Sequence, residues 1–125
     1  MRIEGRFAAA HRLRGYKGEC ENLHGHNYRV EVVFAGEDLD PVGMLMDFRQ
    51  GKDLLAGVLG RLDHAYLNDV EPFDRVNPTS EHIARHVSEA LTGNLPDGLR
   101  VERVTCWESE GCAATYHGGG AASEQ

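Results

Sequence analysis

Residues 23–35 carry the pattern that most constrains what this chain can fold into. Every second position from 24 to 34 holds a histidine or a large apolar or aromatic residue: His24, His26, Tyr28, Val30, Val32 and Phe34. The alternate positions include Arg29 and Glu31. Successive side chains of a β-strand point to opposite faces, so this period of two predicts a strand with one face buried. Such a strand has to be covered by a second layer.

Three further strands are expected from shorter patterns of the same kind. Residues 3–11 alternate up to His11, and residues 99–108 and 112–117 are two runs separated by a short turn at Gly111. The strand over 3–11 lies close in sequence to the one over 23–35, and the strand over 99–108 lies close to the one over 112–117. We therefore expect each of these two pairs to be antiparallel.

Two helices are expected between the strand pairs. Asp47 is a suitable N-cap for a first helix, which would stop near Asp63. A hydroxyl in the run Thr79-Ser80-Glu81 would cap a second helix that Gly93 closes. The order ββααββ predicts an α+β fold in which two helices cover one face of a four-stranded antiparallel sheet. The open edges of such a sheet favour joining of subunits.

The length of 125 residues fits one domain, expected over residues 1–117, with a disordered tail over 118–125. No apolar run approaches the ~20 residues that a membrane helix needs, and no apolar signal block follows Met1. We therefore expect a cytoplasmic protein without a membrane partner. Three cysteines in such a chain indicate thiols rather than a disulfide framework.

The distribution of charge limits the class of partner. A formal net charge of -7 argues against general nucleic-acid binding, which needs a basic face. Arg12, Arg14 and Lys17 nevertheless crowd one short stretch. This cluster suits a phosphorylated small molecule, and it equally suits a solvated loop.

Three histidines predict a catalytic zinc site. His24 and His26 share one strand face at a Cα separation of roughly 6–7 Å, and the preceding strand would bring His11 beside them. Three imidazoles and one open position are typical of catalytic zinc, whereas structural zinc usually has four protein ligands. His82 and His86 form a second pair at helical spacing, but without a third ligand they fit a solvated helix face better.

Five other residues are candidates for chemistry or substrate binding. Cys20, just before the histidine pair, could be a base or nucleophile, a fourth zinc ligand or an idle thiol. Asp63 and His64 hold the ingredients of an oriented base, although the dipeptide alone is weak evidence. Glu108 could accept two parallel N–H bonds from a heterocycle, or be a strand-end charge in water. Thr79 most simply caps the second helix.

Six stretches together resemble the 6-pyruvoyl-tetrahydropterin synthase / 6-carboxytetrahydropterin synthase family, in the family's order and over nearly the whole chain. They are Phe7-x-x-Ala10-His11-x-Leu13, Cys20-x-x-x-His24-Gly25-His26-Asn27-Tyr28, Met46-Asp47-Phe48, Leu62-Asp63-His64-x-Tyr66-Leu67-Asn68, Asn77-Pro78-Thr79-Ser80-Glu81, and Glu108-Ser109 through Tyr116.

The resemblance implies a fold, an assembly and residue roles. The fold would be the tunnelling fold, in which trimers of ββααββ subunits close a barrel and two trimers stack into a hexamer with active sites at subunit boundaries. Each subunit would hold one Zn²⁺. The implied roles are zinc ligands for His11, His24 and His26, proton abstraction for Cys20, assistance from a neighbouring subunit for Asp63 and His64, and pterin binding for Glu108 and Thr79.

The resemblance also implies a reaction. The substrate would be 7,8-dihydroneopterin triphosphate, and the short spacing from Cys20 to His24 resembles the bacterial branch that makes 6-carboxy-5,6,7,8-tetrahydropterin, acetaldehyde and triphosphate for queuosine-type 7-deazapurine synthesis. An intact side chain would instead give 6-pyruvoyl-tetrahydropterin. Glu21 stands where folate-pathway relatives carry a glutamate that cleaves the side chain to a 6-hydroxymethyl product, so a dual activity is a further alternative. A non-catalytic pterin- or zinc-binding module would not need Cys20, Asp63 and His64 together.

Overall fold

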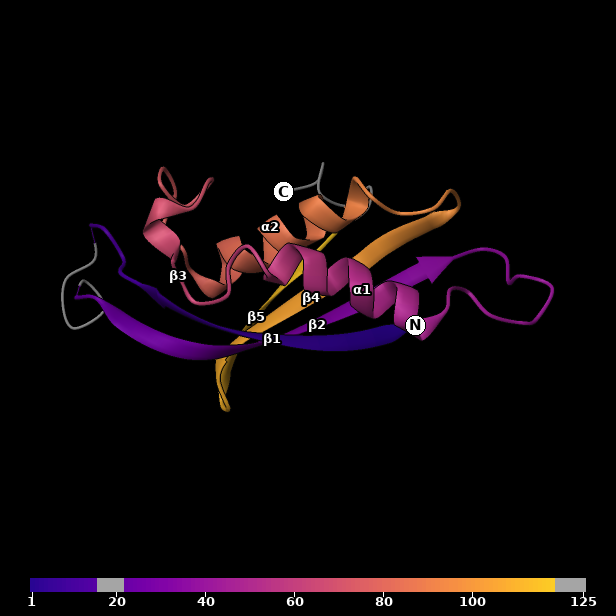
Figure 1. The fold of residues 1–125 in the computed structure, drawn as a ribbon, viewed down its shortest axis with the longest axis horizontal. Coiled ribbons are helices and arrows are strands. Elements are labelled where there is room, and N and C mark those ends of the chain that lie inside the picture. Colours follow the sequence, from indigo (N-terminus) through magenta and orange to yellow (C-terminus); the bar gives the residue numbers. More distant parts are fainter. Residues whose placement is uncertain (16–21, 119–125) are drawn as a thin grey trace.

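The computed structural model describes residues 1–15 and 22–118 as a sheet with helices on one side (Figure 1). The strands are β1 (Arg2–His11), β2 (His24–Gly36), β3 (Ala65–Tyr66), β4 (Leu99–Ser109) and β5 (Cys112–His117). The helices are α1 (Phe48–Leu59) and α2 (Ser80–Thr92), with a short 3₁₀ turn, η2 (Leu67–Asp69), between them. The α+β class and the two helices on one face are as predicted. The predicted tail lies outside the described residues except for Gly118, and the single domain over 1–117 stays a prediction.

The sheet has one strand more than the sequence predicts. Its order is β3-β1-β2-β4-β5, and the four long strands are antiparallel to their neighbours. The fifth, β3, pairs parallel to β1 through Ala9 with Ala65 and Ala10 with Tyr66. The prediction of four strands was therefore incomplete. A strand of two residues is too short to produce a hydrophobic alternation, and only its position beside β1 defines it.

The core lies between the sheet and the helices. The alternation in β2 is confirmed, because Tyr28, Val30, Val32 and Phe34 are all at most 1% exposed. From the helices, apolar side chains at helical spacing meet this face: Leu55, Leu59, Ile83, Val87 and Leu91. The same face of β2 continues into His24 and His26, so the histidines extend the buried face at one end of the sheet.

The helix ends follow from their caps. The Asp47 carboxylate accepts a hydrogen bond from the Arg49 N–H, and the Thr79 hydroxyl accepts one from the His82 N–H, as expected for N-caps. Helix α2 ends at Thr92 before Gly93, as predicted. Helix α1 ends at Leu59, not near Asp63.

The early end of α1 coincides with a turn toward β1. Beyond Leu59 the backbone hydrogen bonds tighten to a three-residue spacing, from Arg61 to Val58 and from Leu62 to Leu59, and the chain turns toward β1.

Among the described residues, none of the helices has the length and apolar character needed to cross a membrane.

His86 on α2 predicts a pH-dependent stability. Its ring packs edge-on against Phe73, with centroids 5.4 Å apart, and burial lowers its pKa below the ordinary 6.5 while Glu89 opposes the shift and Arg61 adds to it. The unfolded chain then binds more protons than the folded one between the two pKa values, so this contribution to stability is lost as pH falls through 6.5.

We therefore expect the free energy of unfolding of metal-free protein to rise between about pH 5 and 7, and to rise less steeply in His86→Gln. Urea unfolding followed by circular dichroism across this range measures both slopes. His117→Gln, at an exposed position on β5, is the matched control and should keep the wild-type slope. Equal slopes for wild type and His86→Gln would contradict the prediction.

Candidate metal centre and the adjoining pocket

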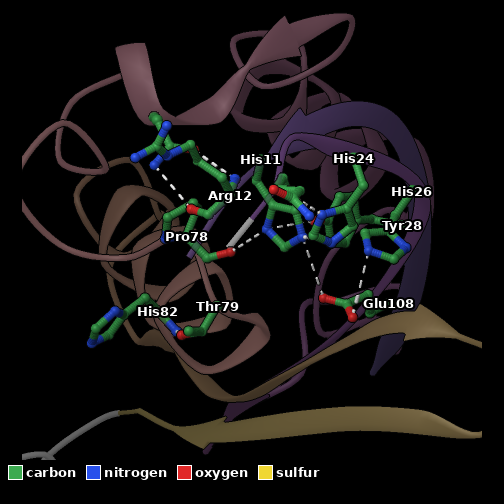
Figure 2. Close-up of polar contacts among 11 residues, drawn as sticks. His11, Arg12, His24, His26, Tyr28, Pro78, Thr79, His82 and Glu108 are labelled. Atoms are coloured by element: carbon green, nitrogen blue, oxygen red, sulfur yellow. Dashed lines mark hydrogen bonds and ion pairs between the residues drawn. The ribbon is translucent and has the colours of Figure 1, made fainter. Parts of the chain in front are cut away.

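Strand register brings the three predicted ligands together. In the antiparallel pairing of β1 with β2, His11 stands opposite His24 and Ala9 stands opposite His26. The ligand-capable nitrogens of His11, His24 and His26 all lie within 4.8 Å of one another. Figure 2 shows the three rings side by side, with the Glu108 carboxylate reaching toward two of them. Such a cluster could hold a metal ion.

Hydrogen bonds to backbone carbonyls set the tautomers of two rings. The Nδ1 of His11 lies 2.8 Å from the Pro78 carbonyl oxygen, and the Nδ1 of His24 lies 2.7 Å from that of Asn22. A carbonyl only accepts, so each Nδ1 carries the hydrogen and each Nε2 of a neutral ring presents a lone pair. These two Nε2 atoms are 3.0 Å apart. Two facing lone pairs at this distance repel each other, and a cation between them removes the conflict.

The third imidazole has an unpaired nitrogen. Among the described residues, the buried Nε2 of His26 has no hydrogen-bond partner, and Oε2 of Glu108 lies 3.6 Å from it. An unsatisfied buried polar atom costs about 1–3 kcal/mol. Tetrahedral zinc with Zn–N bonds of about 2.0–2.1 Å would separate the nitrogens by roughly 3.4 Å, which small ring movements can provide. The donor set of three imidazoles therefore fits zinc.

The protonation of these rings also suits a metal. Burial lowers the pKa of His11 and of His26 below 6.5, the nearby His24 acts in the same direction, and Glu108 opposes it. For His11 the hydrogen bond to Pro78 also opposes the shift. Only neutral imidazole binds a metal, so near neutral pH these two rings are in the binding form.

A small pocket adjoins the histidines. Its volume is about 220 Å³, and Glu108 and Thr79 both line it, together with Leu13, Ser80, Glu81, Cys112, Ala113 and Ala114. The structure thus brings together the two residues predicted to bind the pterin. Cys106 lies buried in β4, near the pocket's Ser80, and burial raises the pKa of its thiol to about 12, so it is not a reactive group.

Asp63 and His64 do not join this cluster. Oδ1 of Asp63 accepts a 2.9 Å hydrogen bond from the Ala8 N–H, which is the main reason that the pKa of Asp63 is lowered, and its Oδ2 lies 3.1 Å from Nδ1 of His64. His64 has a left-handed φ of 58° and a side chain that is 83% exposed. Backbone strain of this kind is concentrated at functional sites. The pair lies at the outer edge of β1, where His64 and His26 both line a second pocket of about 560 Å³.

The structure places only some of the remaining predicted residues. Cys20, Glu21 and Lys17 lie outside the described residues, so their roles stay predictions. The Arg14 guanidinium donates to the carbonyl oxygens of Phe73 and Val76, which is a structural role, whereas the Arg12 side chain is exposed. The basic cluster therefore offers Arg12, not Arg14, to a ligand. Sequence reasoning did not identify Pro78, because its contribution is a backbone carbonyl that carries no side-chain signal.

A larger cavity lies elsewhere in the described part of the chain. It has a volume of about 810 Å³ and lies where the loop after β2 meets the loop before β4, at the opposite end of the sheet from the start of β2 (Figure 1). Five acidic residues line it: Glu37, Asp38, Asp40, Asp47 and Asp97. None of the predicted ligands or pterin-binding residues is among its lining residues.

Comparison with known proteins identifies the family of this chain. The family model described as 6-pyruvoyl tetrahydropterin synthase matches residues 1–119. The chain belongs to this family.

Three proteins of known name are similar to this chain over most of their length. Dihydroneopterin monophosphate aldolase of Pyrococcus furiosus is 40% identical over 102 residues, which cover 82% of each chain. The 6-carboxy-5,6,7,8-tetrahydropterin synthase of Synechocystis is 42% identical over 107 residues, covering 80% of this chain and 81% of that protein. The structure of Caenorhabditis elegans 6-pyruvoyl tetrahydropterin synthase superposes with a TM-score of 0.83 at 34% identity, covering 95% and 94% of the two chains. The predicted tunnelling fold and the prediction of a pterin enzyme are confirmed at the level of the family.

We expect each histidine of the cluster to be required for metal binding. Replacing His11, His24 or His26 by Gln should lower zinc affinity at least about 100-fold, because loss of even an outer-shell partner costs 10- to 100-fold. Glu108→Gln should keep the wild-type affinity, since the Glu108 carboxylate oxygens lie 3.7 Å from Nε2 of His11 and 3.6 Å from Nε2 of His26, beyond the length of a metal–ligand bond. Competition with a chromogenic chelator measures the affinities, and His117→Gln is the control. Wild-type affinity in the three histidine variants would refute the site.

Proposed function

We propose that this protein is a zinc-dependent lyase that converts 7,8-dihydroneopterin triphosphate to 6-carboxy-5,6,7,8-tetrahydropterin, acetaldehyde and triphosphate. The observation that carries the proposal is the cluster of three imidazoles, with lone pairs directed at one another, beside a pocket that Glu108 and Thr79 line. Relatives named 6-carboxy-5,6,7,8-tetrahydropterin synthase in Synechocystis and Bacillus subtilis, at 42% and 41% identity, support this choice of product.

The pocket residues would bind and orient the substrate. The Glu108 carboxylate has two acceptor oxygens, which match two parallel N–H groups on the pyrimidine edge of a pterin. Thr79 begins α2, where the first N–H groups of the helix and its own hydroxyl offer further polar contacts. A pterin held in this way would direct its C6 side chain toward the histidines. Zinc bound there would polarise a side-chain oxygen and acidify the neighbouring C–H bond.

Proton transfer is assigned to Cys20 and to a dyad from a second subunit. Cys20 precedes His24 by four positions, so its thiolate would work beside the metal ligands. Asp63 would orient His64 through the 3.1 Å contact, and both side chains stand at the outer edge of β1, outside their own chain's imidazole cluster. An exposed dyad at an open sheet edge fits a site completed by a neighbouring subunit. We propose the stacked double trimer for this reason.

A second candidate function is cleavage of the dihydroneopterin side chain to a 6-hydroxymethyl product. The relative named dihydroneopterin monophosphate aldolase, at 40% identity over most of the chain, favours it, and Glu21 is the residue that would serve it. Formation of 6-pyruvoyl-tetrahydropterin is a third outcome. The leading proposal also includes one zinc per subunit, a cytoplasmic location and a place in queuosine-type 7-deazapurine synthesis.

The products decide among these functions. Zinc-loaded protein is incubated with 7,8-dihydroneopterin triphosphate, and separately with the monophosphate, and the products are identified by mass spectrometry. We expect 6-carboxytetrahydropterin and acetaldehyde from the triphosphate. Cys20→Ala should lower this rate at least about 100-fold, whereas Glu21→Gln should not, since positioned proton transfer contributes 10²–10⁴-fold.

A 6-hydroxymethylpterin as the sole product, lost in Glu21→Gln, would replace the leading proposal with the aldolase. Tight binding of pterin without turnover of either substrate would identify a binding module.

Mixing variants tests whether the dyad acts between subunits. Cys20→Ala and His64→Ala are each expected to be inactive, but in assemblies formed from an equal mixture roughly a quarter of the boundary sites would hold both native groups. We therefore expect partial recovery of activity after the two are unfolded and refolded together. A mixture of Cys20→Ala with His24→Gln is the control, because both residues belong to one subunit's half of the site. No recovery in the first mixture would place the dyad in the same subunit or outside the reaction.

A further inference from the structure

Two asparagine side chains extend the edge of β1 beyond its last residue. Oδ1 of Asn68 accepts a 2.9 Å hydrogen bond from the Arg12 N–H, and its Nδ2 donates at 3.0 Å to the Arg12 carbonyl oxygen. Asn77 does the same with Arg14, at 2.9 Å for both bonds. Each amide thus pairs with both main-chain groups of one residue, as a neighbouring strand would.

The two amides hold the chain where regular strand pairing stops. Pairing at the outer edge of β1 ends with Ala10 and Tyr66 of β3. The amides then bind both main-chain groups of residue 12 and of residue 14, and residue 14 already lies in a turn. The backbone that leaves His11 is therefore held in place by side chains from segments more than fifty residues away in sequence.

Asn77 also connects directly to the metal centre. It precedes Pro78, whose carbonyl oxygen accepts the hydrogen bond from Nδ1 of His11 (Figure 2). The Asn77 carbonyl oxygen in turn accepts from the Thr79 N–H at 2.9 Å and lies 2.7 Å from Nδ1 of His82. We call the pair of hydrogen bonds between the Asn77 side chain and the Arg14 main chain the Asn77 clamp. The Pro78 carbonyl is thus fixed between this clamp on one side and the first turn of α2 on the other.

We propose that Asn77 is a positioning residue for the metal centre: it fixes the Pro78 carbonyl relative to the backbone beyond His11, and so sets the orientation of the His11 imidazole toward the ion. This inference rests on the proposed function only in that the three histidines bind a metal. An imidazole whose Nδ1–H has a fixed acceptor is held in one tautomer and one orientation, which strengthens its bond through Nε2. Asn68 supports the same segment without contacting Pro78.

The chemistry of the clamp requires an amide. An aspartate at position 77 has nearly the same shape, but its carboxylate only accepts. It keeps the bond from the Arg14 N–H and places a negative oxygen against the Arg14 carbonyl oxygen. Asn77→Asp is therefore a nearly isosteric change that releases one side of the clamp.

The test measures the metal site itself. Zinc affinity of purified Asn77→Asp is measured by chelator competition, and the visible absorption spectrum is recorded for protein saturated with Co²⁺. We expect an affinity roughly 10- to 100-fold below wild type and a changed cobalt spectrum, because the His11 bond is altered even when the site is full. Asn94→Asp, at an exposed asparagine just beyond α2, is the matched control and should change neither quantity.

A further control separates positioning from general loss of stability. Val87→Ala removes buried volume from the core-facing side of α2 and should lower the thermal midpoint, but it should leave the cobalt spectrum unchanged. If Asn77→Asp does not fold, His82→Ala, which removes the side-chain contact to the Asn77 carbonyl, should shift the same spectrum. Wild-type affinity and spectrum in the folded variant would overturn the inference while the metal site stands. Absence of metal binding by the wild-type protein would instead refute the proposed function.

Discussion

The antiparallel pairing of β1 with β2 determines both the core and the metal centre. Phe7 stands opposite Tyr28, their rings stack at 4.7 Å, and four residues along β1 the same register sets His11 opposite His24. The Tyr28 hydroxyl lies 3.2 Å from Nδ1 of His11, so the apolar layer contacts the first imidazole directly. A slip of one residue would turn the histidines of β2 to the other face of the sheet. Burial of the core is therefore also what assembles the site.

The site combines rigid and open parts. His11 is 1% exposed and bonded to a fixed carbonyl, whereas Glu108 is one-third exposed and faces both the imidazoles and the pocket. Asp63 and His64 stand at a sheet edge, and His64 lines a second pocket that His26 also lines. In the proposed assembly, the dyad would complete the site of a neighbouring subunit. Each subunit would then contribute its imidazole cluster to one site and its dyad to another.

The sequence predicted much of this arrangement, and the exceptions share a cause. The alternation of β2 and the caps of α2 are local signals, so the buried face, the shared face of His24 and His26 and the start at Ser80 were all predictable. The strand β3 and the turn after Leu59 depend on contacts with β1, and the two asparagine clamps depend on contacts with the segment just after β1. All of these contacts are distant in sequence. No period or cap reports such contacts. The asparagines lie in stretches that marked the family, yet nothing in their spacing indicates what they bind.

The asparagine clamps also affect how this protein can diversify. Both amides contact only main-chain atoms of the segment after His11, so the hydrogen bonds do not depend on which side chains that segment carries. Leu13, between the two clamped residues, forms part of the pocket wall beside Glu108. The wall at position 13 can therefore change in size or polarity while the backbone course is retained. This separation gives natural variation, or a designer, a place to alter the shape of the pocket without rebuilding the cluster of histidines.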